Sequence, residues 1–267
     1  MDLGLPGKTV IVTGGGSNIG RATVLTFAAE GANVVCADID KKIGRKTVDE
    51  ANSLGVGGRA VLIITDVTDE QSIDRMVNKA LEEFGQIDVL VNNAGGSGGN
   101  YTLPEVSVPQ LLQDHNLTFW SNVRCSKAIV PHMIARKQGT IVNVGSNSGR
   151  LGTATSHGYS SAKGAVIAFT KSLARELSAT GIRVNCVCPG MTLPKSHDEV
   201  GAHSSWTKHA FDRYANPQVV EQYLNAFHLT RVGEAQDISN MVVFLASDCA
   251  SFMTGQTISV DGGETML

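Results

Sequence analysis

Seven short runs rich in β-branched residues recur along the chain, and longer amphipathic stretches separate them. Runs such as residues 9–12 and 140–144 are almost continuously apolar, which is typical of strands in a parallel sheet covered on both faces. The sequence therefore predicts a doubly wound α/β fold, with a mostly parallel seven-stranded sheet and helices on both faces. The strands are expected at residues 8–13, 33–37, 59–65, 88–91, 140–145, 183–187 and 257–260.

Residues 191–228 interrupt this alternation, and we refer to them as the lid segment. No strand is expected there, yet the segment holds the aromatic residues Trp206, Phe211, Tyr214, Tyr223 and Phe227. Disordered segments are poor in aromatic residues, so a helical lid over a substrate site is favoured over a disordered insertion. A chain of 267 residues, 42% of them hydrophobic, can form one domain, which we expect to span residues 1–267.

The charge pattern gives no indication of a polyanionic partner. The net charge is −3, from 22 basic and 25 acidic residues, and no block of Lys or Arg stands out. No apolar run approaches the roughly 18 residues that a membrane span requires. We therefore expect a soluble, cytoplasmic protein that binds neither nucleic acid nor membrane.

Cysteine and histidine spacing does not suggest a metal site. The five cysteines, an odd number, are scattered without a Cys-x-x-Cys pair, which favours buried, reduced thiols over disulfides or metal ligands. His197, His203 and His209 lie six residues apart, a spacing that does not place them on one helical face. We expect no metal.

A glycine-rich turn, Gly14-Gly15-Gly16-Ser17-Asn18-Ile19-Gly20, follows the first predicted strand and leads into a helix expected to begin near Arg21. Glycine allows the backbone to approach a pyrophosphate, which the free N–H groups of a helix N-terminus can bind. A plain tight turn would have the same composition, so the motif needs support from other residues.

Asp38 provides that support at the end of the second predicted strand, 24 residues after Gly14. An acidic side chain there can accept hydrogen bonds from the adenosine ribose hydroxyls, and it would repel a 2′-phosphate. The neighbours Ser17 and Ile39 supply no cation that could bind a 2′-phosphate. The sequence thus favours NAD over NADP, although Asp38 could also be an ordinary helix cap.

Tyr159 and Lys163 form a Tyr-x-x-x-Lys pair in a helical pattern, so their side chains share one face. A phenol, with an unperturbed pKa of about 10, is a poor base, but a neighbouring ammonium lowers that pKa. Ser146 follows the fifth predicted strand and can donate a hydrogen bond to a substrate oxygen. The pair alone is weak evidence for a catalytic site, because the same spacing occurs on many amphipathic helices.

Together, these features resemble the short-chain dehydrogenase/reductase family, and the likeness covers nearly the whole chain. Further matching landmarks are Asp66-Val67, Asn92-Asn93-Ala94-Gly95, Arg183-Val184-Asn185, Pro189-Gly190, Thr254-Gly255-Gln256 and Val260-Asp261-Gly262-Gly263. The resemblance implies that Tyr159 is the general acid/base, that Lys163 also holds the nicotinamide ribose, and that Ser146 orients the substrate oxygen. It also implies a homotetramer.

The resemblance extends to residues that would surround the cofactor and the substrate. The residues expected to bind the cofactor are Gly14, Ser17, Asn18, Ile19, Gly20, Asp38, Ile39, Asp66, Val67, Asn93, Ala94, Gly95, Tyr159, Lys163, Pro189, Gly190 and Thr192. Those expected to contact substrate are Ser146, Ser148, Tyr159, Gly96, Met191 and Trp206.

Three positions depart from the family pattern. Asn18 replaces the middle glycine of the turn, and asparagine tolerates left-handed backbone angles. The proton-relay asparagine maps to Asn116, but the interval from Asn116 to Ser126 is about two residues longer than is usual in the family. This predicts either a bulge near Phe119-Trp120 or a different register, in which Asn122 would be the relay. Pro194 occupies the usual position of a threonine, whose role we give to Thr192.

The predicted activity is that of an NAD-dependent alcohol dehydrogenase of the EC 1.1.1 type. An aromatic lid facing the glycine-rich loop 95–99 suggests a roomy, apolar pocket, which suits a bulky, cyclic or aryl-bearing secondary alcohol or ketone. Lys195, Lys208 and Arg213 could meet a coenzyme A phosphate, but ordinary surface charge explains them more simply. Two alternatives stay open: an NADPH-dependent ketone or acyl-thioester reductase, and a catalytically silent NAD-binding protein.

Overall fold

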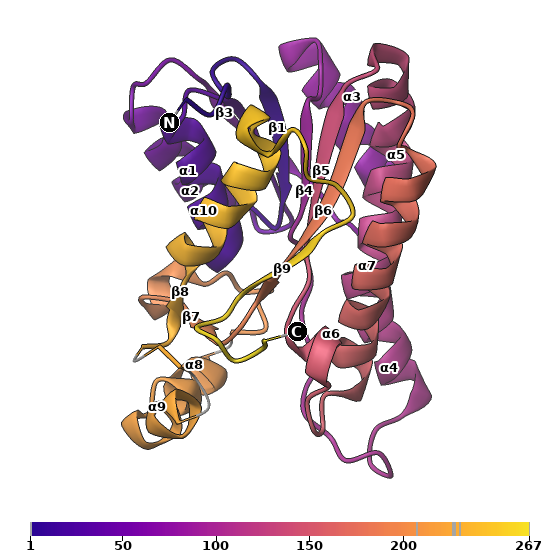
Figure 1. Ribbon diagram of the computed structural model, residues 1–267. Helices are drawn as coiled ribbons and strands as arrows, with labels where there is room; N and C mark the ends of the chain where they lie inside the picture. Colours follow the sequence, from indigo (N-terminus) through magenta and orange to yellow (C-terminus); the bar gives the residue numbers. More distant parts are fainter. Residues whose placement is uncertain (1, 207, 226–227, 230, 267) are drawn as a thin grey trace.

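A seven-stranded sheet forms the centre of the molecule (Figure 1). The computed structural model describes residues 2–206, 208–225, 228–229 and 231–266. The strand order is β3-β2-β1-β4-β5-β6-β9, and every neighbouring pair is parallel. This confirms the predicted doubly wound α/β fold.

Each predicted strand is present within two residues of its expected ends. The strands of the large sheet are β1 (Thr9–Thr13), β2 (Asn33–Asp38), β3 (Ala60–Ile64), β4 (Val89–Asn92), β5 (Gly139–Val144), β6 (Ile182–Pro189) and β9 (Thr257–Val260).

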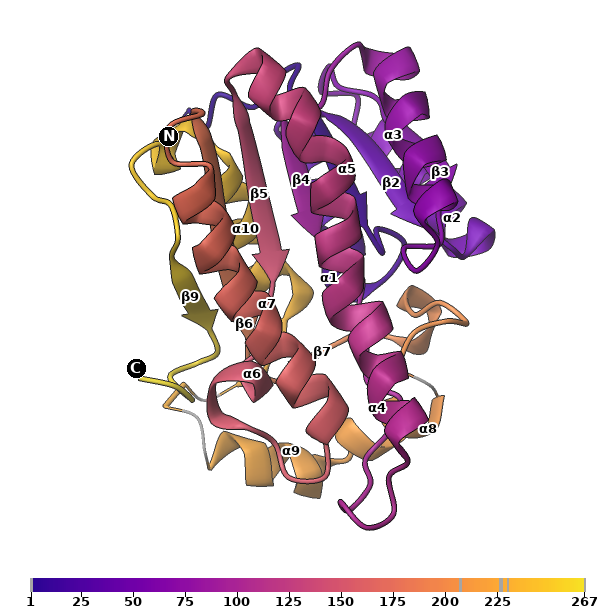
Figure 2. The same ribbon diagram turned by 90° about the vertical axis from the view of Figure 1, so that its right-hand side faces the viewer.

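Helices cover both faces of this sheet, as Figures 1 and 2 show. Helices α1, α2 and α10 lie on one face, and α3, α5 and α7 lie on the other. The helices are α1 (Asn18–Ala29), α2 (Lys41–Ser53), α3 (Glu70–Phe84), α4 (Val108–His115), α5 (Ser121–Arg136), α6 (Ser148–Leu151), α7 (His157–Glu176), α8 (Lys208–Tyr214), α9 (Pro217–Leu224) and α10 (Ala235–Ala246).

The apolar runs of the strands explain why two cores form. Val10 and Val12 of β1 pack with Phe27 of α1, whereas Ile11, between them, packs with Ile129 of α5. Side chains that alternate along a strand point to opposite faces, so a strand with helices on both sides must be apolar at every position. All five residues of β1 are buried.

The described part of the lid segment contains α8, α9 and a 3-10 turn (His197–Glu199), with irregular backbone between them. Phe227, one of its predicted aromatic residues, lies outside the described residues, as does the side chain of Tyr223. The expectation that the segment has no strand is wrong, because β7 (Thr192–Leu193) pairs in parallel with β8 (Gly233–Glu234). Two residues are too few to produce a recognisable alternation in the sequence.

The cysteines are all free. Cys36, Cys125, Cys186 and Cys188 are buried, in agreement with the prediction. Cys249, in a 3-10 turn (Asp248–Ala250), is exposed. The expected burial is therefore wrong for this residue.

Within the described ranges, no helix has both the length and the apolar composition to cross a membrane. Over these same residues, no three His, Cys, Asp or Glu side chains gather in a way that could hold a metal ion.

Candidate functional site

A cleft of about 1120 Å³ opens along the carboxyl edge of the sheet, where ligands bind in folds of this kind. It extends from the glycine turn after β1 to the lid segment. All residues predicted to bind cofactor or substrate line this cleft, with the exception of Gly96. The backbone N–H of Gly96 donates instead to Thr118 Oγ1 at 3.2 Å.

The glycine turn connects β1 directly to α1, which begins at Asn18, three residues before the expected start. Asn18 has a φ of 43°, the left-handed conformation that its replacement of glycine predicted. A Cβ at Gly20 would lie 1.9 Å from the carbonyl oxygen of Gly14, so no side chain fits there. The N-cap Ser17 makes no side-chain capping bond, which leaves first-turn N–H groups of α1 for an anionic ligand. This turn fits a pyrophosphate.

Asp38 is 7% exposed at the end of β2 and lines the cleft beside this turn. Its Oδ2 accepts the N–H of Gly16 and its Oδ1 accepts the N–H of Asp40, both at 2.8 Å. Burial raises the pKa of this carboxyl, although the two backbone hydrogen bonds act in the opposite direction. Asp38 thus fixes the glycine turn and places an acidic oxygen where a ribose could bind.

The end of β4 supports the same turn from the other side. Asn93 Nδ2 donates to the carbonyl oxygens of Thr13 at 2.9 Å and Gly14 at 3.1 Å. The backbone N–H groups of Asn93 and Ala94 both donate to Thr13 Oγ1. These bonds join the ends of the neighbouring strands β4 and β1, so Asn93 and Ala94 hold the glycine turn in place.

Tyr159 and Lys163 lie on the first turns of α7 and line the cleft. Lys163 is 3% exposed, and its Nζ lies 5.6 Å from the centroid of the Tyr159 ring. The same Nζ donates to the carbonyl oxygen of Val144 at 2.6 Å. A buried ammonium with a single neutral acceptor can stabilise a negative charge on the phenol.

Ser146 lies two residues beyond Val144, at the carboxyl end of β5, and is 9% exposed. Its Oγ accepts the N–H of Ser148 at 3.1 Å, which leaves the hydroxyl proton for another acceptor. Ser148 Oγ in turn accepts a hydrogen bond from Thr153 at 2.8 Å. The loop after β5 therefore orients the serine at the cleft surface.

A π turn spans Asn116–Trp120 between α4 and α5. This wider turn is the bulge expected near Phe119-Trp120, and it accommodates extra sequence inside a continuous helix. Asn116 lines the cleft, and its Oδ1 accepts a hydrogen bond from Arg124 at 2.8 Å. Asn122 is buried outside the cleft lining, and its Nδ2 donates to the carbonyl oxygen of Thr118.

The opposite wall follows β6, where Pro189, Gly190, Met191 and Thr192 line the cleft in succession. Thr192 is buried, and its Oγ1 donates to the carbonyl oxygen of Gly190 at 3.1 Å. The N–H of Gly233 donates to the carbonyl oxygen of Met191 at 2.9 Å. Pairing with β8 thus holds Thr192 beside the strand end.

Sequence reasoning missed Asn147 and Glu264, which also line the cleft. Asn147 Nδ2 donates to Glu264 Oε2 at 2.9 Å and to Asp261 Oδ2 at 2.7 Å. Asp261-Gly262-Gly263 was noted only as a landmark, and an acidic residue after two glycines carries no spacing signal of its own. The C-terminal residues reach the cleft because β9 pairs with β6.

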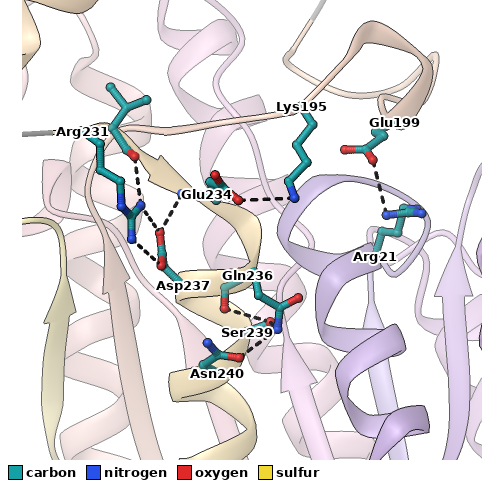
Figure 3. Close-up of polar contacts among 10 residues, drawn as sticks. Arg21, Lys195, Glu199, Arg231, Glu234, Gln236, Asp237, Ser239 and Asn240 are labelled. Atoms are coloured by element: carbon teal, nitrogen blue, oxygen red, sulfur yellow. Dashed lines mark hydrogen bonds and ion pairs between the residues drawn. The ribbon is translucent and has the colours of Figure 1, made fainter.

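Ion pairs attach the lid segment to the rest of the fold (Figure 3). Lys195 Nζ of the lid segment lies 3.3 Å from Glu234 Oε2. Just beyond the segment, Arg231 binds both carboxylate oxygens of Asp237, and we call these two pairs the lid base. Further along the lid, Glu199 lies 3.5 Å from Arg21 of α1. In Figure 3 the first two pairs lie at the base of the lid and the third lies over α1.

The comparisons with known proteins agree with this geometry. A family model described as "Enoyl-(Acyl carrier protein) reductase" matches residues 14–265. The chain is 36% identical to a (2S)-[(R)-hydroxy(phenyl)methyl]succinyl-CoA dehydrogenase subunit, BbsD, of Thauera aromatica, over 99% of each chain. It is 35% identical to the 3-oxoacyl-[acyl-carrier-protein] reductase FabG of Thermotoga maritima, over 97% of this chain and 98% of that one.

Two further similarities involve a diol dehydrogenase and a solved structure. The chain is 35% identical to the 2,3-dihydroxy-2,3-dihydro-p-cumate dehydrogenase of Pseudomonas putida, over 99% of this chain and 97% of the relative. The crystal structure of gox2181 matches with a TM-score of 0.87 and 30% identity, over 97% of this chain and 96% of the other.

Proposed function

This chain belongs to the short-chain dehydrogenase/reductase family, and on that premise we propose that it uses NAD to interconvert a bulky, cyclic or aryl-bearing secondary alcohol and its ketone. The observation that carries the proposal is the buried Lys163 beside Tyr159, in the same cleft as Ser146 and the glycine turn. As an oxidoreductase of the EC 1.1.1 type, the protein acts on alcohols or ketones.

A bound nicotinamide would supply or accept the hydride at the carbinol carbon. Tyr159 takes the hydroxyl proton during oxidation and returns it during reduction. Lys163 stabilises the resulting phenolate by its positive charge and holds the ribose. Ser146 donates a hydrogen bond to the substrate oxygen, and Asn116 relays the proton toward solvent.

Asp38 supports the choice of NAD. The side chain is buried beside the glycine turn, and a carboxylate there favours ribose hydroxyls over a 2′-phosphate. The remaining contacts with NAD would come from the other predicted cofactor residues that line the cleft, from Gly14 to Thr192.

The substrate wall supports an aromatic or cyclic substrate. Trp206 and Tyr214 of the lid segment make an edge-to-face contact, with their ring centroids 5.7 Å apart, and both line the cleft with Met191 and Ser148. The names of two relatives describe a phenyl-bearing and a cyclic hydroxy compound. Glu264, an acidic group in this wall, would favour a neutral alcohol over a carboxylate-bearing one.

The proposal also includes the form of the protein: one catalytic domain over residues 1–267, with the lid segment within it, assembled as a cytoplasmic homotetramer.

An NADPH-dependent acyl-thioester reductase is the second candidate, because the matched family model and FabG both have acyl-carrier names. It would require Asp38 to be ineffective against a 2′-phosphate. A silent NAD-binding protein is less consistent with the presence of Ser146, Tyr159 and Lys163 together.

The test is a panel of cyclic, aryl and linear secondary alcohols, assayed for NADH formation by the native protein and by Tyr159→Phe. We expect NADH with at least one cyclic or aryl alcohol, and a loss of about 10²- to 10⁴-fold in kcat for the variant, since general acid/base catalysis contributes that much. Identical rates for the two proteins would contradict the role of Tyr159. Turnover of thioesters alone, with NADPH, would establish the second candidate.

A further inference from the structure

Part of the lid segment lies near Asp38 and Asp40, where the proposed adenosine ribose would bind. Its residues Gly201, His203, Ser204 and Ser205 line the cleft together with Asp38 of β2. None of these four lid residues belongs to a cofactor motif, and the sequence analysis gave a cofactor role to only one lid residue, Thr192.

Three contacts hold this part of the lid against α1 and α2. Asp40, which caps α2, accepts the N–H of Ala202 at 3.2 Å through Oδ2. Gly201 is so close to Ile43 of α2 that a Cβ would lie 2.2 Å from its Cδ1. Glu199 pairs with Arg21 of α1 (Figure 3). The lid therefore packs on the elements that surround the adenosine position.

His203 follows these contacts directly and lines the cleft beside two acidic groups. Burial raises the pKa of Asp38, and the nearby imidazole opposes that rise. The pKa of Asp40 is lowered, because three backbone N–H groups and the imidazole together outweigh the effect of its burial. An imidazole that lines the cleft near Asp38 and Asp40 can form a hydrogen bond with a ribose hydroxyl that Asp38 also binds.

We infer that His203 is a cofactor-binding residue, and that residues 199–203 of the lid segment complete the adenosine-ribose site together with Asp38. This inference rests on the proposed NAD site and adds a contact outside the family's motifs. It means that one lid covers both ends of the cleft, so that nucleotide binding and ordering of the substrate wall are linked.

The test measures binding without catalysis. ADP-ribose, which contains the adenosine half of NAD and lacks nicotinamide, is titrated by calorimetry into the native protein and into His203→Ala. We expect the dissociation constant to rise about threefold to tenfold, the effect of losing one hydrogen bond. Binding of nicotinamide mononucleotide should stay unchanged, because His203 acts only at the other end.

His197→Ala is the matched control. His197 is on the same lid, is exposed, packs edge-to-face on Phe211 and does not line the cleft. It should bind ADP-ribose with native affinity. Equal weakening in the two histidine variants, or native affinity in His203→Ala, would overturn the inference.

A second pair of variants tests the lid contact independently of His203. Glu199→Gln breaks the pair between the lid and Arg21, whereas Glu50→Gln removes the other partner of the same arginine, which lies on α2. We expect weaker ADP-ribose binding, about twofold, only for Glu199→Gln. If both variants bind like the native protein and His203→Ala does too, the lid plays no part in this site. If the native protein itself fails to bind ADP-ribose, the proposed NAD site is wrong.

Discussion

The two walls of the cleft are built from different kinds of contact. The sheet-edge wall consists of buried polar groups with backbone partners, such as Asp38, Asn93 and Lys163. The lid wall has short helices, a two-residue strand pair and exposed ion pairs such as Lys195–Glu234. Buried hydrogen bonds fix a group within narrow limits, whereas exposed ion pairs contribute little and break easily.

We propose that the two walls have largely separate tasks. Chemistry and most of the nucleotide recognition require positions held by strand ends and by the start of a long helix, and the lid adds His203. Admission of substrate requires a wall that can move at small cost. We therefore expect substitutions in the sheet-edge wall to change kcat or cofactor affinity strongly, and substitutions at the lid base to change KM weakly.

The largest effect is expected from Lys163→Met. This change removes the buried charge beside Tyr159 and the donor to Val144, and kcat for alcohol oxidation should fall about 10²- to 10⁴-fold. Lys171→Met is the control, since Lys171 is exposed two turns further along α7 and should leave steady-state rates unchanged. Equal kcat values for the two variants would mean that the buried Lys163 has no special role in the sheet-edge wall.

Gly20→Ala should have the next largest effect. A Cβ there meets the Gly14 carbonyl, so either the turn or α1 must move, at a cost of about 3 kcal/mol in unfolding free energy, with loss of ADP-ribose binding. The comparison is Gly164→Ala in α7, where a Cβ would have only one contact, at 3.4 Å. That variant should be slightly more stable than the native protein. Urea unfolding of both variants measures the contrast.

The same contrast explains what the sequence could predict. The seven strands were predictable, because nearly continuous apolar runs are typical of a parallel sheet covered on both faces. The left-handed backbone of Asn18 was predictable, because asparagine tolerates these angles where it replaces glycine. The contacts of Glu264 and His203 with the cleft were not. They depend on where a C-terminal tail and an irregular lid lie in space, and no periodicity encodes that placement.

Asp38→Asn should have an intermediate effect, confined to the affinity for the nucleotide. Loss of the acidic acceptor should weaken NADH binding about tenfold to a hundredfold and reduce the preference over NADPH. Because burial raises the pKa of Asp38, NADH affinity of the native protein should decrease as the pH falls through that raised pKa, sooner than for an ordinary aspartate. Fluorescence titrations against pH check this. The variant should lack that pH dependence, and its persistence would point to another group.

Arg231→Ala should have the smallest effect, confined to the lid base. The substitution removes the bidentate ion pair with Asp237, which joins the two ends of the segment around β8. KM for the alcohol should rise about threefold while kcat stays unchanged. The same pair lowers the pKa of Asp237, so its contribution is present above the usual pKa of aspartate and is lost as the pH falls through the lowered one. High salt should reduce the difference between variant and native KM, because screening weakens the pair in the native protein. A large fall in kcat would show that the lid base also positions the catalytic groups, and the division of tasks between the two walls would then be wrong.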